Sequence, residues 1–172
     1  MKNERITKIQ SERLISKILL FADGSEGCMS AAKYGIVLAK ITGAALKAIY
    51  VVNIDLLKQL ERARIFVKVE ELDYERDLEE DGWNYLRDIT DLANSKGLSL
   101  ETELLKGTVH KIAIQKVEEW GADLLIMGEL EPGLARQDTF HDETGLIFRK
   151  ARCSVLMAKD TERIDELFES IT

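Results

Sequence analysis

The chain has 172 residues, of which 45% are hydrophobic and 32% are charged, and its formal net charge is -7 at pH 7. This length fits one domain with an ordinary hydrophobic core. The 31 acidic residues outnumber the 24 basic ones, and the lysines and arginines form no block. Because nucleic acid binding needs clustered positive charge, this composition argues against nucleic acid as a direct partner.

The cysteines and the first apolar run bear on where the protein resides. Cys28 and Cys153 lie far apart without a Cys-x-x-Cys pair, so the sequence indicates neither a zinc site nor a disulfide framework. The apolar run at residues 18–22 is too short for a signal segment or a membrane span. We therefore expect a cytoplasmic protein with no membrane partner.

The first half of the chain begins with a polar extension, residues 1–15, followed by a strand at residues 17–22. This strand stops at the turn sequence Asp23-Gly24-Ser25. A helix with apolar residues in helical steps then runs to Gly43, and residues 45–52 form a second strand. The pattern is that of a βαβ unit.

The segment from residue 54 to residue 96 is charged but keeps apolar residues in helical steps, which predicts one or two helices. Residues 70–81 contain eight acids and one base, Arg76. Two interpretations stay open for this acidic segment. It is either a solvated helix face or a docking surface for a basic partner protein.

The second half repeats the alternation of strand and helix. Residues 98–104 alternate apolar with polar residues, as in a strand at the edge of a sheet. A helix ending at Gly121, a buried strand at residues 124–127, a short helix near residue 147 and a fifth strand at residues 154–158 follow. Residues 159–172 predict a tail helix. Such alternation is typical of a single doubly wound, Rossmann-like α/β domain with helices on both faces of a parallel sheet.

Two segments of the chain resemble universal stress proteins. The first is Ile18-Leu19-Leu20-Phe21-Ala22-Asp23-Gly24-Ser25-Glu26, and the second combines residues 121–128 with residues 151–156. The resemblance implies a universal stress protein domain over residues 16–158 with a five-stranded parallel sheet in the order 3-2-1-4-5. It also implies frequent homodimers and roles in stress survival that are rarely enzymatic.

Part of that family binds ATP through a loop of the form Gly-x2-Gly-x9-Gly-Ser/Thr, in which bare backbone amides approach the phosphates. Counted from Gly128, Glu131 and His141 stand at the other two glycine positions of this motif, and Asp142 stands at its Ser/Thr position. Gly133 is a substitute glycine if the backbone is rerouted. Residues 129–143 contain five acids and one base, Arg136, so we expect a degenerate nucleotide-binding loop.

Other residues of the resemblance remain ambiguous. Asp23 and Val51 match the residues that lie near the adenine in ATP-binding members, whereas Asp23 before Gly-Ser is also ordinary turn or helix-capping chemistry. His141 beside Asp142 suggests a metal ligand or an acid-base pair, or simply a solvated loop. The spacing His-x3-His does not occur, which argues against a metal.

The sequence therefore predicts a non-enzymatic stress-response protein without a cofactor, which pairs as a homodimer through the fifth strand and contacts a protein partner of unknown identity. Val155, Leu156 and Met157 make that strand an apolar edge that calls for a cover. The tail helix is the alternative cover, which would leave a monomer. The alternative function is ATP binding with slow hydrolysis, and the third is an acidic adaptor that docks through residues 70–81.

Overall fold

The computed structural model describes residues 14–62, 68–129 and 143–172. Its five strands pair in parallel in the order β3-β2-β1-β4-β5, which confirms the predicted fold class. The strands are β1 (Lys17–Ala22), β2 (Ala45–Asn53), β3 (Glu101–Gly107), β4 (Leu124–Gly128) and β5 (Ser154–Ala158). The helices are α2 (Glu26–Thr42), α3 (Ile54–Arg62), α4 (Lys68–Ser95), α5 (Val109–Trp120), α6 (Glu143–Lys150) and α7 (Thr161–Ser170).

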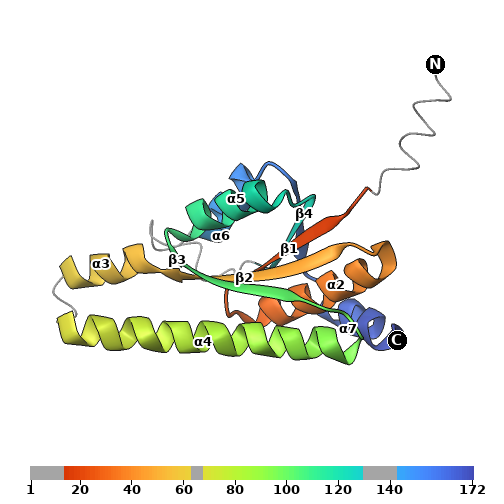
Figure 1. The fold of residues 1–172 in the computed structure, drawn as a ribbon, viewed down its shortest axis with the longest axis horizontal. Helices are drawn as coiled ribbons and strands as arrows, with labels where there is room; N and C mark the ends of the chain where they lie inside the picture. Colours follow the sequence, from red (N-terminus) through yellow and green to blue (C-terminus); the bar gives the residue numbers. More distant parts are fainter. Residues whose placement is uncertain (1–13, 63–67, 130–142) are drawn as a thin grey trace, which may run out of the picture.

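The helices cover both faces of the sheet (Figure 1). Helices α2, α4 and α7 lie below the sheet in this view, and α5 and α6 lie above it. Successive residues of β1 point to opposite faces, so Leu20 joins the core under α2 and α4 while Leu19 and Phe21 join the core under α5. A central strand buried on both faces explains why residues 17–22 form a continuous apolar run instead of alternating.

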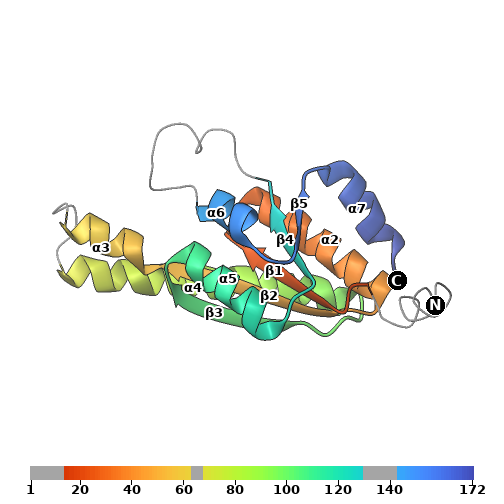
Figure 2. The same cartoon turned by 90° about the horizontal axis from the view of Figure 1, so that it is seen from above.

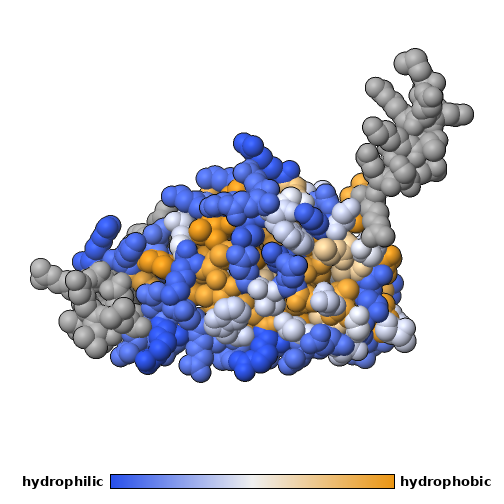
Figure 3. Space-filling view, viewed as in Figure 1, coloured by the Kyte–Doolittle hydropathy of each residue, from blue (hydrophilic) through white to orange (hydrophobic). Residues whose placement is uncertain are grey.

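Two helices fill the charged segment between β2 and β3, as predicted. Together, α3 and the first half of α4 extend beyond the carboxyl ends of β2 and β3 (Figure 1). The outward side of α4 is polar, and the lower edge of the molecule in Figure 3, where α4 lies, is mainly blue. Glu75 and Glu79, two acids of the predicted docking surface, both pair with Lys106 of β3, and Glu75 lies 3.0 Å from it. These two carboxylates therefore attach α4 to the edge strand β3.

The start of β3 differs from the prediction. The strand begins at Glu101 and runs to Gly107, whereas the alternating pattern predicted residues 98–104. The backbone N–H of Leu98 instead donates to Ala93 O at 2.9 Å, and that of Gly97, whose φ is 65°, donates to Asn94 O at 2.9 Å. These two bonds end α4 in a Schellman motif, so Leu98 belongs to the helix cap and packs on the core from there. The predicted edge position of this strand is confirmed.

The tail helix α7 packs on α2 (Figure 2). Lys33 of α2 forms an ion pair with Asp165 at 2.7 Å, and Phe168 is buried with Lys96 Nζ 4.7 Å from its ring centroid. Among the described residues, β4 is the one strand that pairs with β5. A groove of about 350 Å³ runs between β5 and α7, with Leu156 and Leu167 among its lining residues. The helix therefore stands beside the edge of β5.

None of the helices within the described ranges combines the length and the apolar character that crossing a membrane requires.

Candidate functional site

A cleft of about 250 Å³ opens at the carboxyl ends of β1 and β2. Residues of β1, β2, α4, α5 and α6 line it, together with Asp23 from the turn after β1. The chain order makes β1 and β4 neighbours whose connections run to opposite faces of the sheet. Ligands of doubly wound folds bind outside the carboxyl ends of the strands, near such a switch point, so this cleft at the ends of β1 and β2 is the candidate site.

The structure brings Asp23 and Val51 together in this cleft. Asp23 Oδ1 accepts hydrogen bonds from the backbone N–H of Ser25 at 2.9 Å and from Ser25 Oγ at 2.7 Å. Asp23 therefore forms the predicted turn through one carboxylate oxygen, and the same side chain lines the cleft, while its role near an adenine stays a prediction. Ser25, not Asp23, is the N-cap residue of α2.

Tyrosines form the side of the cleft next to α4. Tyr50 of β2 stacks on Tyr85 of α4, with ring centroids 6.2 Å apart and an interplanar angle of 11°. Gly82 allows this approach, since a Cβ there would lie 2.5 Å from Cδ1 of Tyr50. Burial, assisted by the nearby Tyr85 and Asp81, raises the pKa of Tyr50 to about 12. The phenol is therefore neutral at physiological pH and keeps its hydrogen-bond donor.

Glu143 occupies the opposite end of the cleft. Its Oε2 accepts the backbone N–H of His110 at 2.7 Å and lies 2.7 Å from His110 Nδ1. His110 is in the first turn of α5, so the carboxylate of α6 caps the positive end of a neighbouring helix. The N-terminus of a helix ordinarily favours an anion. Here a side chain of the chain itself holds that position.

Gly128 ends β4 where α2 begins. A Cβ on Gly128 would lie 2.5 Å from the carbonyl carbon of Gly27 and 2.8 Å from the backbone nitrogen of Cys28. Backbone atoms cannot move aside as a flexible side chain can, so this position accepts only glycine in the present packing. The first glycine of the predicted loop therefore has a structural task that is independent of any ligand.

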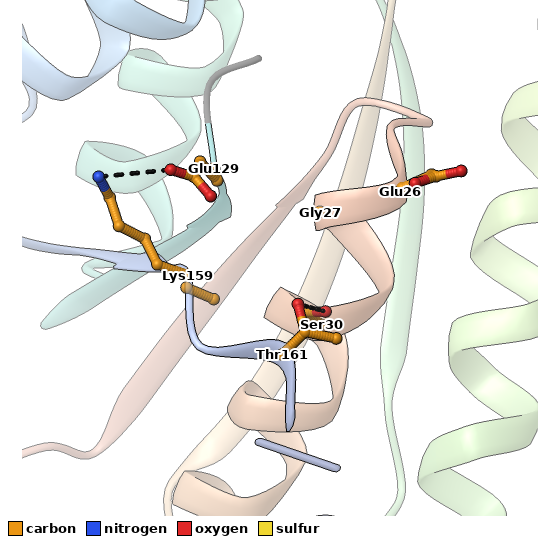
Figure 4. A pocket seen from close by; sticks show the side chains of 7 residues that line it. Glu26, Gly27, Ser30, Glu129, Lys159 and Thr161 are labelled. Carbon is orange, nitrogen blue, oxygen red and sulfur yellow. Dashed lines mark hydrogen bonds and ion pairs between the residues drawn. The ribbon is translucent and has the colours of Figure 1, made fainter. Parts of the chain in front are cut away.

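A second cleft of about 310 Å³ lies between α2, β4 and the start of α7 (Figure 4). Its charged groups are partly paired within the chain, since Lys159 Nζ lies 3.6 Å from Glu129 Oε1. The buried Ser30 donates through Oγ to Thr161 Oγ1 at 3.2 Å. Both contacts are drawn in Figure 4. The polar groups of this cleft thus hold α7 and β5 to the rest of the fold.

The two thiols are poor nucleophiles. Burial, and next the negative charge of Asp23, raises the pKa of Cys28 to about 11. Burial also raises the pKa of Cys153, which is only half-buried at the start of β5. Both thiols are therefore protonated at neutral pH. Within the described parts of the chain, no three histidine, cysteine or carboxylate side chains group as metal ligands would.

Comparison with known proteins identifies the family. The description of the universal stress protein family matches residues 15–159. The chain belongs to the universal stress protein family. A universal stress protein of Methanocaldococcus jannaschii, MJ0531, is 28% identical over 152 residues, which cover 88% of this chain and 86% of the relative.

Solved structures support the fold of this universal stress protein. The hypothetical protein MJ0577 superposes with a TM-score of 0.67 at 20% identity, over 85% of this chain and 96% of the other. The universal stress protein At3g01520 of Arabidopsis thaliana, solved with AMP bound, superposes with a TM-score of 0.59 at 16% identity, over 84% of this chain and 91% of the other. At such identities the likeness establishes the fold alone.

The universal stress protein's predicted site residues fall into two groups. Asp23 and Val51 line the cleft and Gly128 packs on α2 without lining it, and nucleotide binding by these three residues stays a prediction. The others lie outside the described residues, namely Glu131, Gly133, Arg136, His141 and Asp142.

Sequence reasoning missed Glu143 and Tyr50 as residues of this universal stress protein's site. Glu143 directly follows the motif position Asp142, but the partner that gives it a role, His110, is 33 positions away along the chain. Tyr50 was included only as part of an apolar strand. A tyrosine one residue before Val51 is the signal that would have pointed to the cleft, because strand ends line such clefts.

Proposed function

We propose that this universal stress protein is a cytoplasmic, non-enzymatic stress-response regulator that acts as a homodimer and binds ATP weakly or not at all. The observation that carries the weak ATP binding is the carboxylate of Glu143 on the N-terminus of α5, inside the cleft. An anionic ligand would have to displace this carboxylate or bind beside it. Displacement costs the contacts of this carboxylate with His110, and binding beside it forgoes the favourable interaction that a helix N-terminus supplies to phosphate.

Charge along the cleft acts in the same direction. Asp23 and Glu143 both line it, and none of its described lining residues is a lysine or an arginine. The loop sequence from residue 129 to residue 143 adds further acids against the single base Arg136. A triphosphate would meet like charges at close range, where repulsion between two unit charges is about 1 to 4 kcal/mol.

The loop positions themselves supply a steric argument. Family members that bind ATP need bare backbone amides where this chain has Glu131 and His141, and a hydroxyl donor where it has Asp142. Each departure is expected to cost about 1 to 3 kcal/mol of ATP binding, so two of them weaken the affinity by about a hundredfold or more.

Isothermal titration of the wild type with Mg-ATP tests this part of the proposal. We expect a Kd weaker than about 100 µM. Glu131→Gly, His141→Gly and Asp142→Ser combined should strengthen it by about a hundredfold. Wild-type binding at low micromolar concentration, or no gain in the triple variant, would contradict the proposal. Folding of the triple variant is checked by its urea unfolding curve.

The absence of enzymatic activity is proposed from the groups around the cleft. No catalytic motif of a known nucleophile or phosphate-binding type occurs in the sequence. The histidine of the cleft region, His110, is held by Glu143, whose oxygen also accepts the His110 backbone N–H. Phosphate release from ATP no faster than in buffer is expected, and steady release that Glu143→Gln abolishes would contradict this.

The homodimer is proposed from the edge of β5. Val155, Leu156 and Met157 are half-buried in the single chain, and a groove between β5 and α7 adjoins them. A two-fold antiparallel pairing of β5 would satisfy its unpaired backbone groups and cover these side chains. Since α7 packs on α2, it leaves room for this pairing beside the groove.

Sedimentation at tens of micromolar checks the dimer. The wild type is expected to sediment as a dimer, and Leu156→Lys as a monomer, because a charge in the pairing edge must be desolvated. Ile41→Lys is the matched control, since Ile41 is 70% exposed on α2 and its change should leave the dimer intact. A monomeric wild type would overturn the proposal.

The second candidate function is adenine-nucleotide binding with slow hydrolysis. The observation that favours it is that Asp23 and Val51 line one cleft, and a neighbour of the same fold was solved with AMP bound. Nucleotide that co-purifies with the protein would favour this candidate. A clean preparation together with a flat ATP titration favours the first.

A regulator is expected to bind a partner protein, and α4 is the candidate docking surface for it. The acids left for it on α4 are those outside the Lys106 cluster, including the exposed Asp77, Glu80 and Asp81. The test is the binding of a captured partner to the double variant Asp77→Lys, Glu80→Lys and at raised salt. Binding that neither the double variant nor salt weakens would exclude α4 as the docking surface.

A further inference from the structure

We propose that the cleft between Asp23 and Glu143 binds a small organic cation, such as a quaternary ammonium group. The inference rests on the proposed function in one respect, because a cleft that bound ATP tightly would have no reason to favour positive charge. It names the ligand class that the same site would accept in place of a polyphosphate.

The first argument is the charge of the cleft. Its described charged lining residues are carboxylates, Asp23 from β1's turn and Glu143 from α6. Each uses one oxygen within the fold, Asp23 Oδ1 for Ser25 and Glu143 Oε2 for His110. Among the described residues, no hydrogen bond reaches Asp23 Oδ2 or Glu143 Oε1. Two carboxylates from different elements, each with a second oxygen, give a negative potential that a cation would neutralise.

The second argument is the aromatic lining of the same cleft. Tyr50 and Tyr74 line it, and Tyr74 is 40% exposed, whereas Phe21, which also lines it, is buried in the core. The faces of aromatic rings attract ammonium groups through the ring quadrupole, most strongly for cations that are weakly hydrated. The stacking of Tyr50 on Tyr85 fixes one of these rings before a ligand arrives, so little side-chain freedom is lost on binding.

The third argument is size. A cleft of about 250 Å³ is smaller than the clefts of about 300 to 1,000 Å³ that hold drug-sized ligands. It suits a compact cation better than a nucleoside triphosphate. Tyr50 adds a neutral hydroxyl that is available to a polar group on the same ligand, because its raised pKa keeps the phenol protonated.

The experiment titrates isotope-labelled wild-type protein with choline and follows backbone amide shifts. The expected result is saturable binding in the millimolar range, with shifts at Asp23, Tyr50 and Val51. The neutral isostere 3,3-dimethylbutan-1-ol has the same shape without the charge. It should bind about fivefold more weakly or not measurably. Equal binding of both compounds would overturn the proposal, because shape alone would then explain the affinity.

Variants locate the binding. Asp23→Asn keeps an acceptor oxygen for Ser25 but removes the charge, and it should weaken choline binding by about tenfold. Tyr74→Leu should weaken it by about fivefold. The control is Glu80→Gln, which removes the same charge from an exposed position of α4 and should leave the affinity unchanged. If Glu80→Gln weakened binding as much as Asp23→Asn, the attraction would come from net charge alone and the proposal would fail.

The outcome is separable from that of the proposed function. A protein that binds neither choline nor ATP refutes the cation site and leaves the proposed function intact. A protein that binds ATP at low micromolar concentration refutes both.

Discussion

Each end of the cleft carries one carboxylate, yet the two carboxylates differ in the groups that they already bind. At the β1 end, one carboxylate oxygen of Asp23 accepts hydrogen bonds from Ser25 within its own turn, and the side chain still lines the cleft. At the α6 end, Glu143 caps the N-terminus of α5, a position that favours an anion. The difference teaches that the chain itself supplies the anion at one end of the cleft, whereas the carboxylate at the other end is bound only by its own turn.

The largest effect on stability is expected from a change at Gly128, where the end of β4 packs against α2. Gly128→Ala places a methyl group 2.5 Å from a backbone carbon of Gly27, so α2 or β4 must shift. We expect the free energy of unfolding in urea to fall by about 3 kcal/mol. This loss should occur without any ligand, which separates the packing role of the glycine from a phosphate-binding role.

Gly35→Ala provides the matched control for that prediction. The nearest atoms to a Cβ at Gly35 are side-chain methyl groups 3.6 Å away, an ordinary contact. Since alanine is the better helix former, this change within α2 should stabilise the protein by about 0.5 to 1 kcal/mol. If Gly128→Ala were as harmless as Gly35→Ala, the close contact between β4 and α2 would be wrong.

The next effect concerns Cys28, which lies buried beneath the Asp23 end. Its pKa is raised from the ordinary 9.0 to about 11, so the folded protein keeps the thiol protonated where the unfolded chain ionises it. The stability linked to this thiol is full below pH 9 and is lost as the pH rises toward 11. Over that range the loss should be about 2 to 3 kcal/mol.

Urea unfolding at pH 8 and pH 11 checks the linkage. Cys28→Ala is expected to be less stable than the wild type at pH 8, because a buried group is truncated. Its loss of stability between the two pH values should nevertheless be about 2 to 3 kcal/mol smaller. Parallel losses in the two proteins would show that Cys28 is not the titrating group.

The smallest effect is expected at the other end of the cleft. Glu143→Ala removes the cap from α5 and should lower the free energy of unfolding by about 1 to 2 kcal/mol. Glu143→Gln retains an acceptor for His110 N–H and should lose less. Glu80→Ala, at an exposed position of α4, should change stability by less than about 0.5 kcal/mol. No difference between the two alanine variants would remove Glu143 from its capping role.

Some strand bounds could be predicted from the sequence and others could not. Strands β1 and β5 begin and end where the apolar runs predicted, because burial on the sheet leaves a direct trace in composition. The start of β3 was misplaced, because Leu98 and Leu100 are apolar for packing against the core and not for pairing with β2. An alternating pattern cannot separate these two causes.

The residues of the site were harder to predict from the sequence than the strands. Asp23 was predicted as a site residue from the resemblance to universal stress proteins, and its turn could be predicted from the local sequence. Glu143 was missed, because its partner on α5 becomes a neighbour only when α6 packs beside that helix. The sequence therefore predicted one carboxylate of the cleft, but not the one that caps α5.

Parallel titration of the wild type with adenosine and with Mg-ATP tests the central claim most directly. The two ligands share the base and ribose and differ in the phosphates, so their affinity ratio reports what the phosphates contribute to binding. Because a carboxylate already caps α5 and no described lining residue is a lysine or an arginine, the phosphates should add nothing. ATP should bind no more tightly than adenosine. ATP binding more than about tenfold tighter than adenosine would contradict the account.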